Sequence, residues 1–236
     1  MTVQVYQIAH GACPYLPNRS WITQTFQIPS LEDKIYEHMI NSGWRRSGPM
    51  FYQNHCPGCS LCIPIRIPVT RFAPSKSQRR VWKKNSDVAV VRQPTHFTEE
   101  SFELYQKYQA ARHDPDDNVT HAGYLGFLGR SPVTTQMMSY YADGRLIGIG
   151  WVDILPSSVS SVYFVFDPDY SRRSLGTFSV LKEIELCQEL GKPFHHLGFY
   201  VPGSRKMTYK ANFRPHQLLI RGEWRDHYES GEPSNE

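Results

Sequence analysis

Residues 135–166 read TQMMSYYADGRLIGIGWVDILPSSVSSVYFVF, and this stretch decides the fold. Residues 135–141 and 145–154 alternate well enough for β structure, and residues 159–166 form a third run rich in β-branched and aromatic side chains. Asp143-Gly144 lies between the first two runs and is typical of a type I′ hairpin turn. The pattern therefore predicts three consecutive antiparallel strands.

A helix and two more strands are predicted after this stretch. Residues 167–171, DPDYS, lead into a helical pattern over residues 175–190, which Gly191 ends and Pro193 prevents from continuing. Residues 195–200 and 217–221 then read as strands. Three antiparallel strands, a loop entering a helix and a further strand are the order expected of a GNAT-like acyltransferase domain.

The loop that enters the predicted helix, RRSLGTF, departs from the acetyl-coenzyme A pattern. A helix N-terminus can hold a pyrophosphate through its backbone N–H groups. Phe178 occupies the place where the usual loop ends in Gly or Ala. This difference favours an activated acyl donor other than coenzyme A.

The first part of the chain has a different texture. It is predicted to hold one helix, which Ser30 caps and Gly43 ends, and short β-like runs at residues 65–69 and 88–92. A second helix is predicted to begin at Thr98 and to end near residues 113–117. The fold class is α/β (α+β): an irregular N-terminal α/β module over residues 1–95, a GNAT-like domain over residues 96–225, and a polar, disordered tail over residues 226–236.

Positive charge is concentrated in the N-terminal module. Between Asn41 and Thr95 there are ten Lys or Arg residues and one acid, Asp87, although the formal net charge of the whole chain is only +4. Such an asymmetry is typical of a nucleic-acid footprint, and a solvated basic face is the alternative.

Three cysteines beside this basic region suggest a metal site. Cys56, Cys59 and Cys62 have a spacing that brings thiolates around one ion, and Cys13 or His55 would supply a fourth ligand. The alternative is a group of small, half-buried thiols without a metal.

Composition limits where the protein is expected to act. The chain has five cysteines, and it lacks both a secretory signal and an apolar run long enough to cross a bilayer. We therefore expect a cytosolic protein without disulfides or membrane contact.

Six blocks of this sequence resemble the aminoacyl-tRNA–protein transferases, most closely the bacterial aspartate/glutamate leucyltransferase branch. The blocks are GACPYLPNR (11–19), GWRRSG (43–48), CPGCSLCIPIR (56–66), FAPSKSQRR (72–80), FDPDYSRRSLG (166–176) and GFYVPGSRKMTYK (198–210). The resemblance implies transfer of leucine from leucyl-tRNA to proteins that begin with Asp or Glu, which marks them for degradation. The related eukaryotic branch transfers arginine and has a metal or iron-sulfur site in its N-terminal domain, so a structural zinc or iron-sulfur cluster is left open here.

The implied reaction indicates which residues do the work. An aminoacyl-tRNA ester is already activated, so the transfer itself requires no cofactor, and positioning with oxyanion stabilisation carries most of the catalysis. The catalytic candidates are Tyr163, Asp167, Asp169 and Tyr209. The candidates for binding tRNA or the acceptor are Arg45, Arg46, Arg66, Lys76, Arg79, Arg80, Arg173, Lys206 and Lys210.

Other interpretations remain open from the residues alone. Asp167 and Asp169 would favour an arginyl donor if they lined an acidic pocket, or would only cap the turn. A non-catalytic RNA-binding module with a thiol or metal cluster is a further alternative, because aromatic residues are interleaved with the basic ones. It does not explain the GNAT-like domain.

Overall fold

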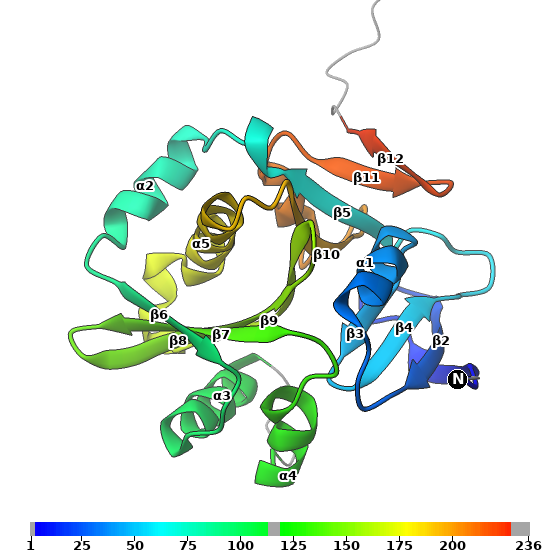
Figure 1. Cartoon of the computed structure of the whole chain (residues 1–236), viewed down its shortest axis with the longest axis horizontal. Helices are drawn as coiled ribbons and strands as arrows, with labels where there is room; N and C mark the ends of the chain where they lie inside the picture. Colours follow the sequence, from blue (N-terminus) through cyan, green and yellow to red (C-terminus); the bar gives the residue numbers. More distant parts are fainter. Residues whose placement is uncertain (1–2, 113–118, 228–236) are drawn as a thin grey trace, which may run out of the picture.

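The computed structural model describes residues 3–112 and 119–227, which form two β-sheets flanked by helices (Figure 1). The larger sheet has the order β12 (Glu223–Asp226), β11 (Gln217–Ile220), β5 (Ile63–Pro68), β10 (Phe194–Tyr200), β9 (Ser158–Phe166), β8 (Arg145–Ile154), β7 (Thr135–Ala142), β6 (Ala89–Pro94). The smaller sheet has the order β1 (Tyr6–Ala12), β2 (Ser20–Gln27), β4 (Met50–Asn54), β3 (Arg45–Ser47). The α-helices are α1 (Asp33–Asn41), α2 (Lys76–Lys84), α3 (Glu99–Arg112), α4 (His121–Tyr124) and α5 (Leu175–Glu189).

The predicted acyltransferase-like core is present. Strands β7, β8 and β9 are antiparallel neighbours, and α5 connects β9 to β10, which runs parallel to β9. The turn between β7 and β8 has positive φ at both central residues, 49° at Asp143 and 73° at Gly144, as a type I′ turn requires. The predicted α/β class is confirmed.

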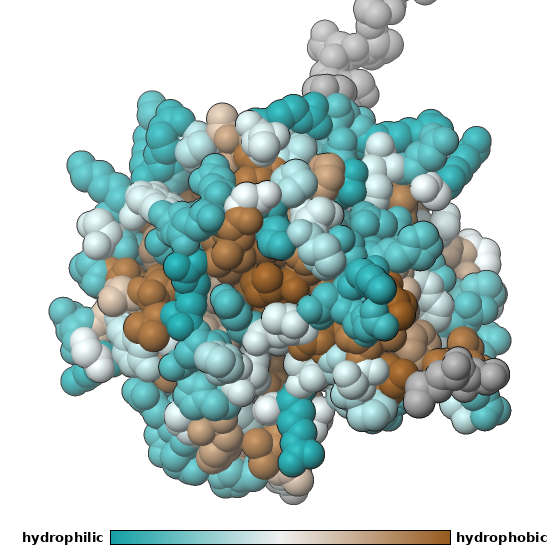
Figure 2. Space-filling model, viewed as in Figure 1, coloured by the Kyte–Doolittle hydropathy of each residue, from teal (hydrophilic) through white to brown (hydrophobic). Residues whose placement is uncertain are grey.

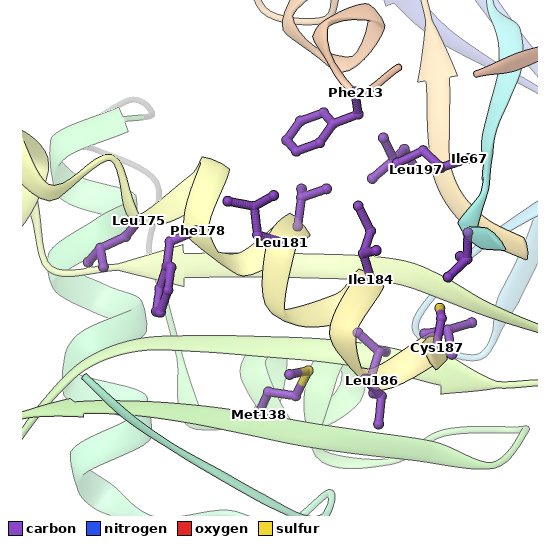
Figure 3. Packing of buried hydrophobic residues seen from close by; sticks show 14 of the residues in the cluster. Ile67, Met138, Leu175, Phe178, Leu181, Ile184, Leu186, Cys187, Leu197 and Phe213 are labelled. Carbon is purple, nitrogen blue, oxygen red and sulfur yellow. The ribbon is translucent and has the colours of Figure 1, made fainter. Parts of the chain in front are cut away.

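Helix α5 covers one face of the larger sheet. Figure 3 shows its apolar side chains, among them Leu181 and Ile184, directed toward Ile67 and Leu197 of the strands. Phe178 is buried in the same cluster, so the residue that breaks the coenzyme A pattern serves as core. Helix α3 covers the opposite face of β8 and β9, where Phe102 belongs to a second buried cluster. Both faces of the central strands are therefore covered.

Burial on both faces corrects one expectation. Simple alternation predicts that only one of His195 and His196 lies inside. The structure buries both, because α5 covers one side of β10 and Arg45, Arg66 and Trp224 surround His196 on the other.

The boundaries of several elements also differ from the predictions. The first helix is capped by Glu32, without a side-chain hydrogen bond, and Ser30 is not its cap. A strand, β12, follows the one that was expected to be last. Strands β5 and β6 precede residue 95, yet they belong to the larger sheet, and the division into modules stays a prediction. The predicted helix end near residues 113–117 lies outside the described residues, as does the predicted tail from residue 228 onward.

The buried ion pair between Arg46 and Asp153 joins the two sheets. Arg46 lies on β3, and its Nε donates to Asp153 Oδ2 of β8 at 2.7 Å. The side chains are 3% and 0% exposed. Arg46 also donates to Gly48 O, just beyond its own strand, and to Thr135 Oγ1 of β7. Its guanidinium therefore connects the smaller sheet to both β7 and β8.

Helix α2 was not predicted from the sequence, because its mostly charged residues show little of the apolar periodicity that indicates a helix. Ser75 accepts a hydrogen bond from the Gln78 backbone N–H at 3.3 Å, and the Gln78 side chain accepts one from the Ser75 N–H at 2.8 Å. This is a capping box, with Gln in the third position.

Ser75→Ala should lower the free energy of unfolding by about 1 kcal/mol, because it removes the cap of α2. Urea denaturation followed by circular dichroism measures the change. The control is Ser86→Ala, at an exposed residue just beyond the same helix. Equal stabilities of the two variants would contradict a role for the cap.

Within the described segments, no helix combines the length and the apolar character needed to cross a membrane.

Candidate active site

Strands β9 and β10 separate along their length, and the candidate site lies where they part. They pair only from Phe194 opposite Ser158 to His196 opposite Ser160. Beyond this point β9 stays paired with β8 and β10 with β5, and Figure 1 shows the two strands diverging. Polar side chains from β3, β9, β10, α5 and the 3-10 helix η4 (Thr208–Asn212) gather around this divergence.

An acid, a histidine and a serine form one network beside the divergence. Glu183 of α5 accepts a hydrogen bond from the Ser161 hydroxyl, and its Oε2 lies 2.8 Å from His195 Nε2. The side chains of His195 and Glu183 are 0% and 3% exposed. A buried carboxyl group is costly unless it is hydrogen-bonded, and Ser161 and His195 supply these contacts to Glu183.

The network has unused hydrogen-bonding capacity. His195 Nδ1 is buried and has no partner among the described residues. Ser161 Oγ lies 3.2 Å from His195 Nε2 as well as bonding Glu183, so the hydroxyl touches both. Ser161 is half-buried, and it is the member of the network nearest to solvent.

Arg45 reaches the same residue from the smaller sheet. Its guanidinium donates to Ser160 Oγ at 2.9 Å and to the carbonyl oxygen of Ser161. Ser161 is thus held by a cation through its backbone and by a carboxylate through its side chain. Arg45 is buried, unlike the exposed basic residues of α2.

Lys210 is the second buried cation at the divergence. Its ammonium donates to Phe199 O at 3.0 Å. Burial, together with the nearby Arg45, lowers the pKa of Lys210 to about 7. Lys206, another of the binding candidates, is exposed, whereas Lys210 is buried.

The two candidate tyrosines lie in different surroundings, Tyr163 against the second buried cluster and Tyr209 on η4. Tyr163 of β9 donates to Gln109 Oε1 at 3.5 Å and packs edge-on against Phe127. Burial raises the pKa of Tyr163 above its ordinary value. Tyr209 is an exposed residue, yet desolvation around its phenol, with the nearby Glu183, raises the pKa of Tyr209 to about 12. Both phenols stay protonated at neutral pH and can act as hydrogen-bond donors.

The two aspartates at the end of β9 are engaged by a lysine. Asp167 accepts the backbone N–H of Asp169 at 3.0 Å, which is the capping arrangement of such a turn. Lys107 lies 2.7 Å from Asp167 Oδ1 and 2.6 Å from Asp169 Oδ2. This lysine neutralises much of the negative charge that an acidic pocket would need.

The remaining basic candidates lie apart from the divergence or are already engaged. Arg66 stacks on the rings of Phe194 and Trp224 and donates to Gln217 Oε1 at 2.8 Å. Arg173 is paired with Asp87 at 2.8 Å. Lys76, Arg79 and Arg80 form an exposed group on α2. Such a group is suited to phosphates rather than to a buried substrate.

The four N-terminal cysteines meet in space. Cys13, Cys56, Cys59 and Cys62 line one small cavity of about 40 Å³. Cys56 Sγ lies 3.4 Å from the backbone nitrogen of Ile22, which donates to it. Cys187 is remote, buried in α5 within the main core.

The cysteine cluster does not fit a metal in its present arrangement. Burial and the neighbouring thiols raise the pKa of Cys62 to about 12, so without an ion this side chain is a thiol at neutral pH. Among the described residues, no three His, Cys, Asp or Glu side chains are placed to hold an ion. A zinc or iron-sulfur site here stays a prediction, and no step below passes through one.

Sequence reasoning missed Glu183 and Ser161. A signal for Glu183 was present: in the helix over residues 175–190 it falls three residues after Val180 and four before Cys187, on the apolar face. A carboxylate on a buried helix face needs a partner, and His195 of the next strand supplies it.

The surface around the divergence has an apolar centre. Figure 2 shows hydrophobic residues gathered in the middle of the face where α5, β9 and β10 lie in Figure 1, with hydrophilic side chains around them.

Comparisons with known proteins extend over nearly the whole chain. The N-terminal and C-terminal models of arginine-tRNA-protein transferases match residues 11–80 and 100–220. An aspartate/glutamate leucyltransferase of Methylobacillus flagellatus is 39% identical, over 94% of this chain and 91% of the relative. Those of Pseudomonas fluorescens and Hahella chejuensis are 36% and 35% identical, each over 94% of this chain and over 96% and 97% of the relatives.

Solved structures resemble the chain more distantly. The C-terminal domain of a putative lysylphosphatidylglycerol synthetase from Agrobacterium fabrum has a TM-score of 0.49 at 12% identity, covering 81% of this chain and 62% of that one. FemX has a TM-score of 0.46 at 7% identity, covering 89% of this chain and 84% of that one.

Proposed function

This chain belongs to the arginine-tRNA-protein transferase family, and from that premise we propose that it transfers leucine from leucyl-tRNA to the α-amine of proteins that begin with Asp or Glu. It is an aminoacyltransferase. The observation that carries the proposal is the 35–39% identity to aspartate/glutamate leucyltransferases over nearly the full length. The product would carry a new N-terminal leucine, a degradation signal read in the cytoplasm.

The reaction is aminolysis of an ester. The acceptor nitrogen forms a bond to the leucyl carbonyl carbon, the bond from that carbon to the ribose oxygen breaks, and a proton passes from the nitrogen to the departing oxygen. An α-amine has a pKa near about 8, so a useful fraction is neutral at physiological pH. The enzyme must therefore position the amine, accept its proton and stabilise the oxyanion.

Residues at the divergence of β9 and β10 can perform these steps. Glu183 and His195 are hydrogen-bonded to the half-buried Ser161 hydroxyl, which can relay a proton from the amine. The protonated phenols of Tyr163 and Tyr209 are candidate donors to the oxyanion. A low-dielectric, water-poor setting strengthens each of these interactions.

The donor side chain is better matched by leucine than by arginine. Asp167 and Asp169 would have to attract an arginyl side chain, but Lys107 is already within ion-pair distance of both. The apolar surface beside the divergence suits an aliphatic side chain (Figure 2). The exposed basic residues of α2 offer charge for the tRNA backbone.

The proposal is tested by transfer of label. The protein is incubated separately with labelled leucyl-tRNA and arginyl-tRNA and with peptides that begin with Asp, Glu, Asn or Lys. Label should pass from leucyl-tRNA to the Asp and Glu peptides, and poorly to the others. Transfer only from arginyl-tRNA would contradict the donor assignment, and transfer from neither donor would contradict the function.

A further inference from the structure

Two cations are buried together at the divergence of β9 and β10 without an acid to balance them. Arg45 and Lys210 are 7% and 8% exposed. Within the described residues, their hydrogen bonds go to Ser160, Ser161 and Phe199, all neutral oxygens. Burying unpaired charge is unfavourable, and proteins usually avoid it. An anion bound between them would balance Arg45 and favour the charged form of Lys210, whose pKa is lowered to about 7.

The side chains of Arg45 and Lys210 approach each other beside Gly198 of β10. A Cβ atom added at Gly198 would stand 3.4 Å from Lys210 Nζ and 3.7 Å from Arg45 Nη2. Gly198 has φ of 87°, which side-chain-bearing residues rarely adopt, and β10 has an irregular register beside it. Because Gly198 has no side chain, Lys210 Nζ and Arg45 Nη2 can both lie close to the backbone of β10.

Donor capacity remains at this point. An ammonium carries three N–H donors, and the bond recorded for Lys210 uses one of them, to Phe199 O. His196, on the same strand, is buried with Nε2 lacking a partner in the described part of the chain. Burial, then Arg45 and Arg66, lower the pKa of His196 well below its ordinary value, so it adds no competing charge.

Arg45 and the acidic Glu183 both bind Ser161. Arg45 binds the carbonyl of Ser161, while Glu183 accepts from the hydroxyl of the same residue. Arg45 and the Glu183 carboxyl group therefore bind two different atoms of Ser161. An N-terminal Asp or Glu has the complementary pattern, an amine and a side-chain carboxylate a few bonds apart.

We propose that Arg45 and Lys210 bind the side-chain carboxylate of the acceptor's first residue and direct its α-amine toward Glu183 and Ser161. This inference rests on the proposed transferase function. The other arginines that could read an acid are less suited: Arg46 is paired with Asp153, and Arg66 is stacked between two rings.

The pKa of Lys210, about 7, gives the wild-type enzyme a pH signature. Protonated Lys210 binds a carboxylate, and neutral Lys210 does not, so the preference for Asp over Asn should fall as the pH rises from 6 to 8. The carboxylate of the Asp peptide raises the pKa of its own α-amine, so each rate is first divided by the neutral fraction of that peptide's amine. The other groups near the two cations, His196, Tyr36 and Tyr52, stay neutral over this range, because their pKa values are shifted away from it.

The experiment compares kcat/KM for leucine transfer to peptides that differ only in Asp, Glu or Asn at the first position. Lys210→Met and Arg45→Lys should each reduce the Asp-to-Asn ratio about 10- to 100-fold, the value of one charged hydrogen bond. A loss of rate that the Asn peptide shares reflects other roles of these residues, such as the bond from Arg45 to Ser161, and cancels in the ratio. Matched controls are Lys34→Met and Arg225→Lys, at exposed residues whose changes should leave the ratio intact.

Stability separates recognition from a structural role. Lys210→Met removes an unpaired buried cation, so its melting temperature should equal or exceed that of wild type while selectivity is lost. If both variants keep the wild-type ratio, the inference fails although transfer stands. If a variant does not fold, the wild-type pH series decides: a constant Asp-to-Asn ratio from pH 6 to 8 overturns the role of Lys210. Absence of transfer in the wild type would instead contradict the proposed function.

Discussion

Glu183→Gln is expected to lower kcat for aminoacyl transfer about 10²- to 10⁴-fold, the range for loss of a positioned proton acceptor. The amide keeps the shape of the side chain and can still accept from Ser161, but it cannot take up a proton as a carboxylate can. KM for aminoacyl-tRNA should change little, because the exposed basic residues of α2 are unaffected. Single-turnover transfer at saturating leucyl-tRNA measures the chemical step directly.

Glu185→Gln is the matched control for this experiment. Glu185 lies two residues along α5, pairs with Lys182, and has a side chain 34% exposed. It should retain a near wild-type rate. A Glu183→Gln enzyme that also kept the wild-type rate and pH profile would reduce the network of Glu183, His195 and Ser161 to a structural role.

Arg46→Ala is expected to lower the free energy of unfolding by about 3–5 kcal/mol, because it leaves Asp153 buried without its cation. The loss should be visible as a reduced midpoint in urea or guanidinium denaturation. The double variant Arg46→Met, Asp153→Leu removes both charges and should recover most of the stability, since the single change is harmful through the unpaired carboxylate.

Arg92→Ala supplies the comparison for the ion pair. Arg92 pairs with Glu189 at 2.5 Å, but their side chains are 40% and 47% exposed. Exposed pairs contribute about 0–1 kcal/mol, so this variant should be nearly as stable as wild type. If Arg46→Ala cost no more than Arg92→Ala, the pair with Asp153 would not be what attaches the smaller sheet.

The central strands and α5 could be predicted because local pattern and tertiary structure agree there. The Asp143-Gly144 turn fixes the pairing of its two strands, and the helix ends at Glu189, just before Gly191 and Pro193. Helix α2 was missed because its sequence, KSQRRVWKK, has few apolar residues to reveal a period. The smaller sheet was missed because its strands are mainly polar and β1 is exposed throughout.

Much of the candidate site could not be inferred from local pattern. Glu183, Ser161 and Arg45 are far apart in the chain and meet only because β9 and β10 part after Ser160. Arg45 and Arg46 are adjacent and chemically alike, yet one meets Asp153 and the other meets neutral oxygens. The sequence does not show where the acids lie in space, and that placement decides which arginine is free to read a substrate.

The most direct test of the proposed function is a competition between donors. Leucyl-tRNA and arginyl-tRNA are supplied together in equal amounts, with a peptide that begins with Asp, and the peptide product is identified by mass spectrometry. The account predicts a product extended by leucine at its N-terminus, formed by wild type and lost with Glu183→Gln. A product extended by arginine, or an unmodified peptide after many turnover times, would contradict it.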